Sequence, residues 1–200
     1  MIINRSELKQ SAKDSLRGRW GTAIGMIFMY VIVTGIAGSF ILGALAIPFL
    51  MIGLTKVFLQ ISRNQETSNS TLFEYFSIFW KAFGLNFMIG LFTMLWSMLF
   101  VIPGIIASLS YSMSLYIMAD NKDIGIFDAI NESKRITRGY KWDLFVLGLS
   151  FIGWGILCVL SIGIGFIWLV PYTKITYANF YNKLIYKPEI VDNGDFAPIA

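Results

Sequence analysis

Two lysines lie next to long apolar segments, where a positively charged side chain could bind an anion. Lys56 and Lys174 each follow a threonine, and each lies at the end of a long run that has no other charged residue. Charged side chains within membrane-spanning segments are costly, and they commonly mark the path of an ion or solute. Two cations without an embedded carboxylate favour an anionic solute or a lipid headgroup.

A second interpretation is that both lysines extend to the cytoplasmic interface and only help to place the chain in the membrane. If they instead face a cavity open to the cytoplasm, polar side chains of other apolar segments complete its lining. The candidates for that lining are Tyr111, Asn86 and Asn179. The sequence leaves both interpretations open.

Composition argues against most catalytic chemistry. The 200 residues include no histidine and one cysteine, Cys158. Imidazole acid–base catalysis, a histidine-bound zinc and an intramolecular pair of redox cysteines are therefore excluded. Asp120 and Asp123 superficially suggest a metal or phosphate site, but the end of one helix at Asp120 and the cap of the next at Asp123 explain them more simply. We expect no catalytic residue, no metal and no cofactor.

The elements that must position these residues have the composition of a membrane protein. Hydrophobic residues make up 56% of the sequence and charged residues 14%, against roughly 25% charged in soluble domains. Three runs, 21–55, 82–119 and 144–173, contain no Asp, Glu, Lys or Arg. Each exceeds the roughly 17–25 residues of one crossing, so each predicts two helices. We predict an all-α, polytopic membrane protein with six transmembrane helices in three hairpins.

Glycine and proline place the hairpin turns at 35–38, 102–104 and 161–165. All 16 basic residues lie outside these turns. Because positive residues accumulate in cytoplasmic loops, we predict that both termini are cytoplasmic.

Three tryptophans, Trp20, Trp80 and Trp142, mark the starts of the three runs and lie 60 and 62 residues apart. Each follows a segment of mixed polarity with helical periodicity, as in an amphipathic helix at a membrane surface. Asn4 is a candidate cap of the first such helix, and 71–74 fits a capping box for the second. We predict a single membrane domain over 1–187, with repeat units 4–62, 70–119 and 123–187, and a disordered cytoplasmic tail over 188–200.

An Arg-Gly pair precedes two of the tryptophans, in "LRGRW" at 16–20 and "TRGYKW" at 137–142. A helix in the membrane plane must turn through about a right angle to enter the bilayer, and glycine permits the backbone angles of such a turn. Gly18 and Gly139 are therefore predicted elbows, with the tryptophans as interfacial anchors. The predicted contacts to anionic headgroups are Arg17, Arg19, Arg138 and Lys141.

The chain resembles the bacterial integral membrane proteins of domain-of-unknown-function family 975. The resemblance rests on "NRSELKQSAKDSLRGRWGTAIG" at 4–25, "IPGIIASLSYSMSLYIMADN" at 102–121 and "GIGFIWLVPYTKITYANFY" at 163–181. It implies a protein of the bacterial cytoplasmic membrane, and it implies no activity, substrate or cofactor.

We therefore expect a non-catalytic protein that acts through the lipid bilayer or through a membrane protein, including a second copy of the chain, and not through nucleic acid. The alternative is a small transporter or channel for an anionic solute or lipid, with its site near Lys56 and Lys174.

Overall fold

The computed structural model describes residues 4–38, 47–161, 163–186, 189–190 and 196–197. Its helices, with η marking 3₁₀ helices, are α1 (Arg5–Leu16), α2 (Trp20–Gly38), α3 (Ile47–Ser62), η2 (Asn69–Leu72), η3 (Glu74–Ile78), α4 (Phe79–Leu99), α5 (Val101–Tyr111), α6 (Ser114–Asp120), α7 (Ile126–Thr137), α8 (Lys141–Leu160) and α9 (Phe166–Ile185). In the tail, β1 (Glu189–Ile190) pairs with β2 (Phe196–Ala197) in antiparallel orientation. Apart from this two-residue pair, the regular secondary structure of the described residues is helical, as predicted.

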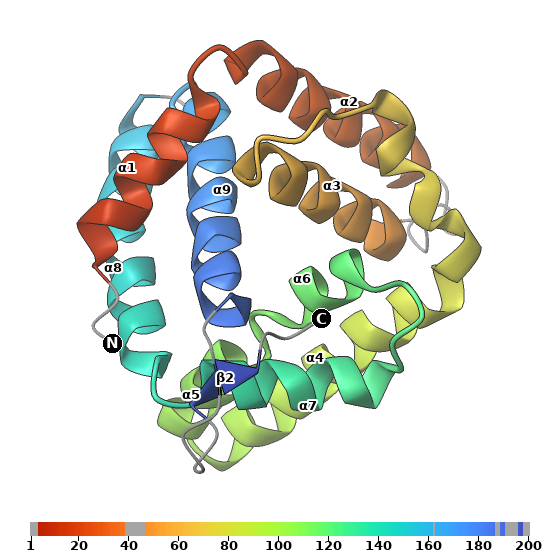
Figure 1. Ribbon diagram of the computed structural model, residues 1–200, viewed down its shortest axis with the longest axis vertical. Helices are drawn as coiled ribbons and strands as arrows, with labels where there is room; N and C mark the ends of the chain where they lie inside the picture. The colour runs from red at the N-terminus through yellow and green to blue at the C-terminus, as the bar shows by residue number, and fades with distance from the viewer. Residues whose placement is uncertain (1–3, 39–46, 162, 187–188, 191–195, 198–200) are drawn as a thin grey trace.

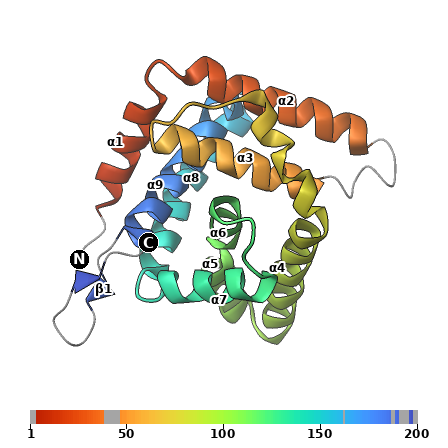
Figure 2. The ribbon, with the colours of Figure 1, turned by 45° about the vertical axis from the view of Figure 1, so that its right-hand side comes forward.

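Consecutive long helices lie side by side: α2 packs on α3, α4 on α5, and α8 on α9. Figure 1 shows these pairs on three sides of the molecule. The turned view in Figure 2 shows the short helix α6 between them. The interior of the fold is therefore organised around α6.

Three helical stretches are long and apolar enough to cross a membrane: Ser70–Met98, Val101–Asp120 and Lys141–Leu160. A fourth is added if α1 and α2, which meet at 90°, count as one bent span. The helix α3 is apolar but has 16 residues. Length and composition thus agree with a membrane protein in which the described residues provide three or four spans.

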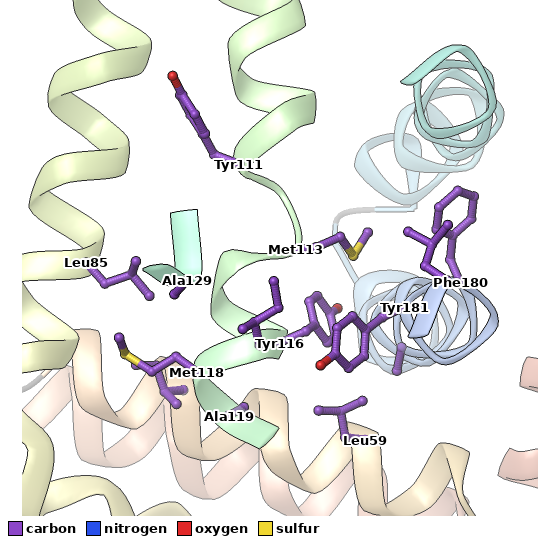
Figure 3. Packing of buried hydrophobic residues seen from close by; sticks show 14 of the residues in the cluster. Leu59, Leu85, Tyr111, Met113, Tyr116, Met118, Ala119, Ala129, Phe180 and Tyr181 are labelled. Carbon is purple, nitrogen blue, oxygen red and sulfur yellow. The ribbon is translucent and has the colours of Figure 1, made fainter. Parts of the chain in front are cut away.

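The helix α6 is surrounded by apolar side chains. Tyr116, Met118 and Ala119 are buried, and they face residues of α3, α4 and α9 (Figure 3). The rings of Tyr116 and Tyr181 stack with their centroids 5.8 Å apart. Burial on all sides fixes the position of α6, and with it the position of Asp120 at its end.

A break at residues 112–113 separates α5 from α6. The buried hydroxyl of Ser133 on α7 donates a hydrogen bond to the carbonyl of Ser110 at 2.7 Å and accepts one from the N–H of Met113 at 3.2 Å. Backbone groups freed by a helix break must find another partner when they are buried. Ser133 supplies that partner.

The predicted helix caps are confirmed in part. The side chain of Asn4 accepts a hydrogen bond from the N–H of Ser6 at 3.1 Å and so caps α1. The predicted capping box at 71–74 is wrong, because these residues run across η2 and η3 and the cap of η2 is Ser68. Asp123 is not a cap either, because α7 begins after Gly125 without a side-chain cap.

The predicted turns also agree in part. The chain leaves α8 at Leu160 and enters α9 at Phe166, so the described residues 161 and 163–165 separate these helices as expected. Near 102–104 the chain turns earlier, at the extended residue Phe100, and Pro103 lies in the first turn of α5, where a missing N–H costs no helical hydrogen bond. Residues 35–38 form the end of α2, and 39–46 lie outside the described residues.

Candidate functional site

Polar side chains join the ends of α3, α6 and α9. Arg63, directly after α3, donates from Nη1 to Oδ1 of Asp120 at 2.7 Å and from Nη2 to Oδ2 at 2.8 Å. Its Nε donates to Oδ1 of Asn182 on α9 at 3.0 Å, and Asn182 donates to the Ser62 hydroxyl at 2.9 Å. Bidentate guanidinium–carboxylate pairs are strong and fix geometry. We call Lys56, Ser62, Arg63, Asp120 and Asn182 the polar network.

Lys56 approaches the same carboxylate. Its Nζ lies 3.6 Å from Oδ1 of Asp120, and the side chains of Lys56, Arg63 and Asp120 are 23%, 17% and 24% exposed. The hydrogen bonds to Asp120 also raise the pKa of the Arg63 guanidinium above its ordinary value. The hypothesis of two cations without a nearby carboxylate is therefore corrected: α6 ends beside α3, and Asp120 compensates Lys56.

Lys174 lies in a different place. It lines a cavity of about 220 Å³ between α2, α3 and α9, whose other walls include Tyr30, Leu54 and Phe58. Lys56 is not among the lining residues. Within the described part of the chain, the Nζ of Lys174 has no carboxylate at ion-pair distance and no hydrogen bond. Lys56 and Lys174 thus do not line one cavity. Of these two lysines, Lys174 is the one whose charge has no counter-charge in the described part of the chain.

The other residues proposed to line a shared cavity are engaged elsewhere. The side chain of Asn86 donates to the carbonyl of Ala82 in its own helix at 3.0 Å. Asn179 on α9 donates to the hydroxyl of Ser11 on α1 at 3.2 Å. The ring of Tyr111 is buried, with the Nζ of Lys134 5.5 Å from its centroid. The structure does not bring these three side chains to Lys174.

The elbow between α1 and α2 has the predicted shape. The two helices meet at 90°, and Gly18 at the bend has a φ of 76°. Arg19 does not reach outward from it: its guanidinium donates to the carbonyls of Gln65 at 3.0 Å and Asn64 at 3.2 Å. Arg19 therefore ties the elbow to the chain that follows α3.

The elbow before α8 shows the same backbone feature, since Gly139 has a φ of 86°. The remaining predicted anchors lie at the surface: Arg17, Arg138, Trp80 and Trp142 are exposed, and Trp20 and Lys141 are half-buried. Trp80 and Trp142 are the second residues of α4 and α8, and Trp20 is the first of α2. Their contact with lipid headgroups stays a prediction.

Sequence reasoning missed the connection between Arg63, Asp120 and Asn182. A signal for half of it was present, because Lys56 and Arg63 are seven residues apart, about two helical turns, and so lie on one face of α3 and its end. Nothing local pointed to Asp120, which is 57 residues from Arg63. In the described residues no group of three acidic, histidine or cysteine side chains is placed to hold a metal ion.

The chain matches a family of known proteins. The family model described as "Protein of unknown function (DUF975)" matches residues 1–103 and 98–187. No curated protein matches the chain, and neither does any solved structure.

Proposed function

The chain belongs to the DUF975 family of proteins of unknown function, and on that premise we propose that it is a non-catalytic, multi-pass protein of the bacterial cytoplasmic membrane. In this proposal six helices cross the membrane as three hairpins, with both termini cytoplasmic. The protein acts by binding membrane lipids or a membrane-protein partner.

The observation that carries this proposal is the apolar outer face of the helix pairs. Large hydrophobic side chains are exposed along α2, α4 and α8, among them Phe28, Ile32, Met94, Met98, Ile156 and Val159. Soluble proteins rarely expose contiguous apolar surfaces of this kind, because water contact with them is unfavourable. Lipid acyl chains cover such surfaces without that penalty.

The polar network supports a non-catalytic role. Its carboxylate and guanidinium bind each other at both oxygens, and Asn182 is bound by Arg63 and Ser62. Groups that satisfy one another in this way hold helices together, and they leave no strong base or nucleophile facing a substrate.

Cysteine labelling tests the proposed topology. Starting from Cys158→Ser, single cysteines are introduced and treated in spheroplasts with a membrane-impermeant maleimide. The positions are Ser6, Gln65 and Lys122, expected inside, and Phe100 and Ile164, expected outside. In intact spheroplasts we expect labelling only of the cysteines at positions 100 and 164. After lysis we expect labelling at all five positions. Labelling of Gln65 or Lys122 before lysis would overturn the six-span topology.

A second candidate function rests on the cavity at Lys174. A single uncompensated ammonium group in an apolar cavity of about 220 Å³ suits a small anionic solute. In vesicles containing the purified protein, uptake of radiolabelled acetate or phosphate is expected to fall to the protein-free rate for Lys174→Gln. The matched control is Lys134→Gln, an exposed cation on α7. Equal uptake by both variants, or none by the wild type, would reject transport through this cavity.

A further inference from the structure

A larger groove lies between α1, the start of α2, α8 and α9, and neither the polar network nor Lys174 lines it. Its volume is about 640 Å³, within the roughly 300–1,000 Å³ of small-molecule sites. Its walls are mainly aromatic and aliphatic, with Trp20, Trp154, Leu157 and Trp168 among them. Trp154 and Trp168 are 57% and 52% exposed, so the groove opens onto the outer surface of α8 and α9.

The wall formed by α1 carries positive charge. Lys9 and Lys13 line the groove, and because they are four residues apart they lie on one face of the helix. The Nζ of Lys9 is 4.9 Å from the ring centroid of Phe151, and that of Lys13 is 6.0 Å from the ring centroid of Tyr172. Aromatic faces attract cations, so these contacts keep both ammonium groups against the groove.

Neither ammonium group has a counter-charge in the described part of the chain. The acidic residues of α1 are committed elsewhere: Glu7 accepts a hydrogen bond from Lys183 at 2.8 Å, and Asp14 lies 3.7 Å from Arg17. The hydrogen bond from Asn179 to Ser11 also holds α1 against α9. The two lysines are therefore presented on a fixed wall with their charge uncompensated.

We propose that this groove binds an anionic phospholipid, with the phosphate at Lys9 and Lys13 and one acyl chain along Trp154, Leu157 and Trp168. The inference rests on the proposed place of the protein in the membrane and adds a defined lipid site to it. Two ammonium groups next to an apolar wall match a ligand that is anionic at one end and apolar at the other. The half-exposed side chains of Trp154 and Trp168 open the groove to the outer surface of α8 and α9, where an acyl chain can enter.

The test measures lipid retention by native mass spectrometry of the detergent-purified protein, titrated with phosphatidylglycerol, phosphatidylcholine or glycerol 3-phosphate. The wild type is expected to retain phosphatidylglycerol in preference to the zwitterionic lipid. Lys9→Gln/Lys13→Gln should weaken that retention about tenfold or more, since each charge-assisted contact contributes substantially. Lys9→Arg/Lys13→Arg, which keeps both charges, should restore most of it.

The matched control is Arg5→Gln/Lys134→Gln, which removes the same charge from exposed positions that do not line the groove. It should retain phosphatidylglycerol like the wild type. Equal loss in both double variants would overturn the site and indicate general electrostatic attraction. Retention of glycerol 3-phosphate as strong as that of the lipid would overturn the acyl-chain part and leave a small-anion site.

The outcome is separable from that of the proposed function. If cysteine labelling gives the six-span topology but both lipids are retained equally, the groove proposal fails and the membrane proposal stands. If labelling gives another topology while the lysine-dependent preference for phosphatidylglycerol persists, the topology fails and the lipid site stands.

Discussion

Replacing Asp120 with alanine removes the carboxylate of the polar network. Arg63 then loses two charge-assisted hydrogen bonds, at 2.7 and 2.8 Å, and Lys56 loses its counter-charge at 3.6 Å. Two cations remain near each other where one anion had compensated both. Asp120→Ala is therefore expected to destabilise the fold far more than the loss of a surface carboxylate.

The magnitude follows from the exposure of the network. Removing one partner of a fully buried ion pair costs about 3–5 kcal/mol, whereas an exposed pair contributes about 0–1 kcal/mol. Because the side chains of Arg63 and Asp120 are 17% and 24% exposed, we expect a cost of about 2–3 kcal/mol, between these limits. For a chain of this size that corresponds to a fall in Tm of about 4–12 °C.

The assay is thermal unfolding in mild detergent, followed by tryptophan fluorescence. Asp123→Ala is the control, because Asp123 is exposed and its side chain has no ion pair in the described part of the chain; its Tm should change by about 1–2 °C at most. Arg63→Ala/Asp120→Ala should cost less than the sum of the two single changes, since neither Arg63 nor Asp120 is then left without the other. The reasoning would be refuted if Asp120→Ala had the Tm of the wild type. It would also be refuted if the loss of stability in the double variant equalled the sum of the two single losses.

Two further stability predictions use the same assay. Gly18→Ala and Gly139→Ala should each lower the free energy of unfolding by about 1–2 kcal/mol, because φ values of 76° and 86° are strained for alanine. Gly21→Ala in helix α2 should be neutral or stabilising. Equal melting temperatures of the three variants would contradict this. Ser133→Ala should lower the free energy of unfolding by about 1–3 kcal/mol, because it removes the partner of the Met113 N–H and leaves the Ser110 carbonyl with only the 3.5 Å bond from Thr137. Ser150→Ala, which loses a bond within its own helix, should cost less, and the opposite order would contradict the role of Ser133.

Local features of the sequence were enough to predict most of the helices and one elbow in detail. The three uncharged runs contain nearly all of α2, the start of α3, most of α4, all of α5, most of α6, most of α8 and the start of α9. These helices were predictable because an apolar segment is recognised from neighbouring residues alone. Gly18 was identifiable for the same reason, since a glycine between a charged helix and an apolar one marks the bend. The predicted right angle is confirmed at 90°.

The break between α5 and α6 could not be predicted in this way. Residues 112–113 are serine and methionine, and neither interrupts a helix strongly. The break is held by Ser133, which is 20 residues away from Met113. A helix break that is stabilised by a distant side chain cannot be predicted from the residues at the break itself.

The sequence also did not predict which part of the molecule packs against α1. Leu8, Ala12 and Leu16 form the apolar stripe of α1, and the predicted helix at the membrane surface would turn this stripe toward lipid. The structure instead buries it completely against protein, chiefly α9 and α3. Helical periodicity shows which face is covered and does not show what covers it. The charged neighbours Lys9 and Lys13 consequently face a groove whose walls come from α8 and α9.

The polar network also sets an order for assembly of the chain. Arg63 is synthesised 57 residues before Asp120 and 119 residues before Asn182. Bringing together groups so distant in sequence costs loop-closure entropy, and the bonds among them offset part of that cost. A chain that stops before α9 leaves the Nε of Arg63 and the hydroxyl of Ser62 without the Asn182 bonds of the finished fold. Completion of the last helix is therefore the step that closes the molecule, and truncated chains remain distinguishable from finished ones by these unmet polar groups.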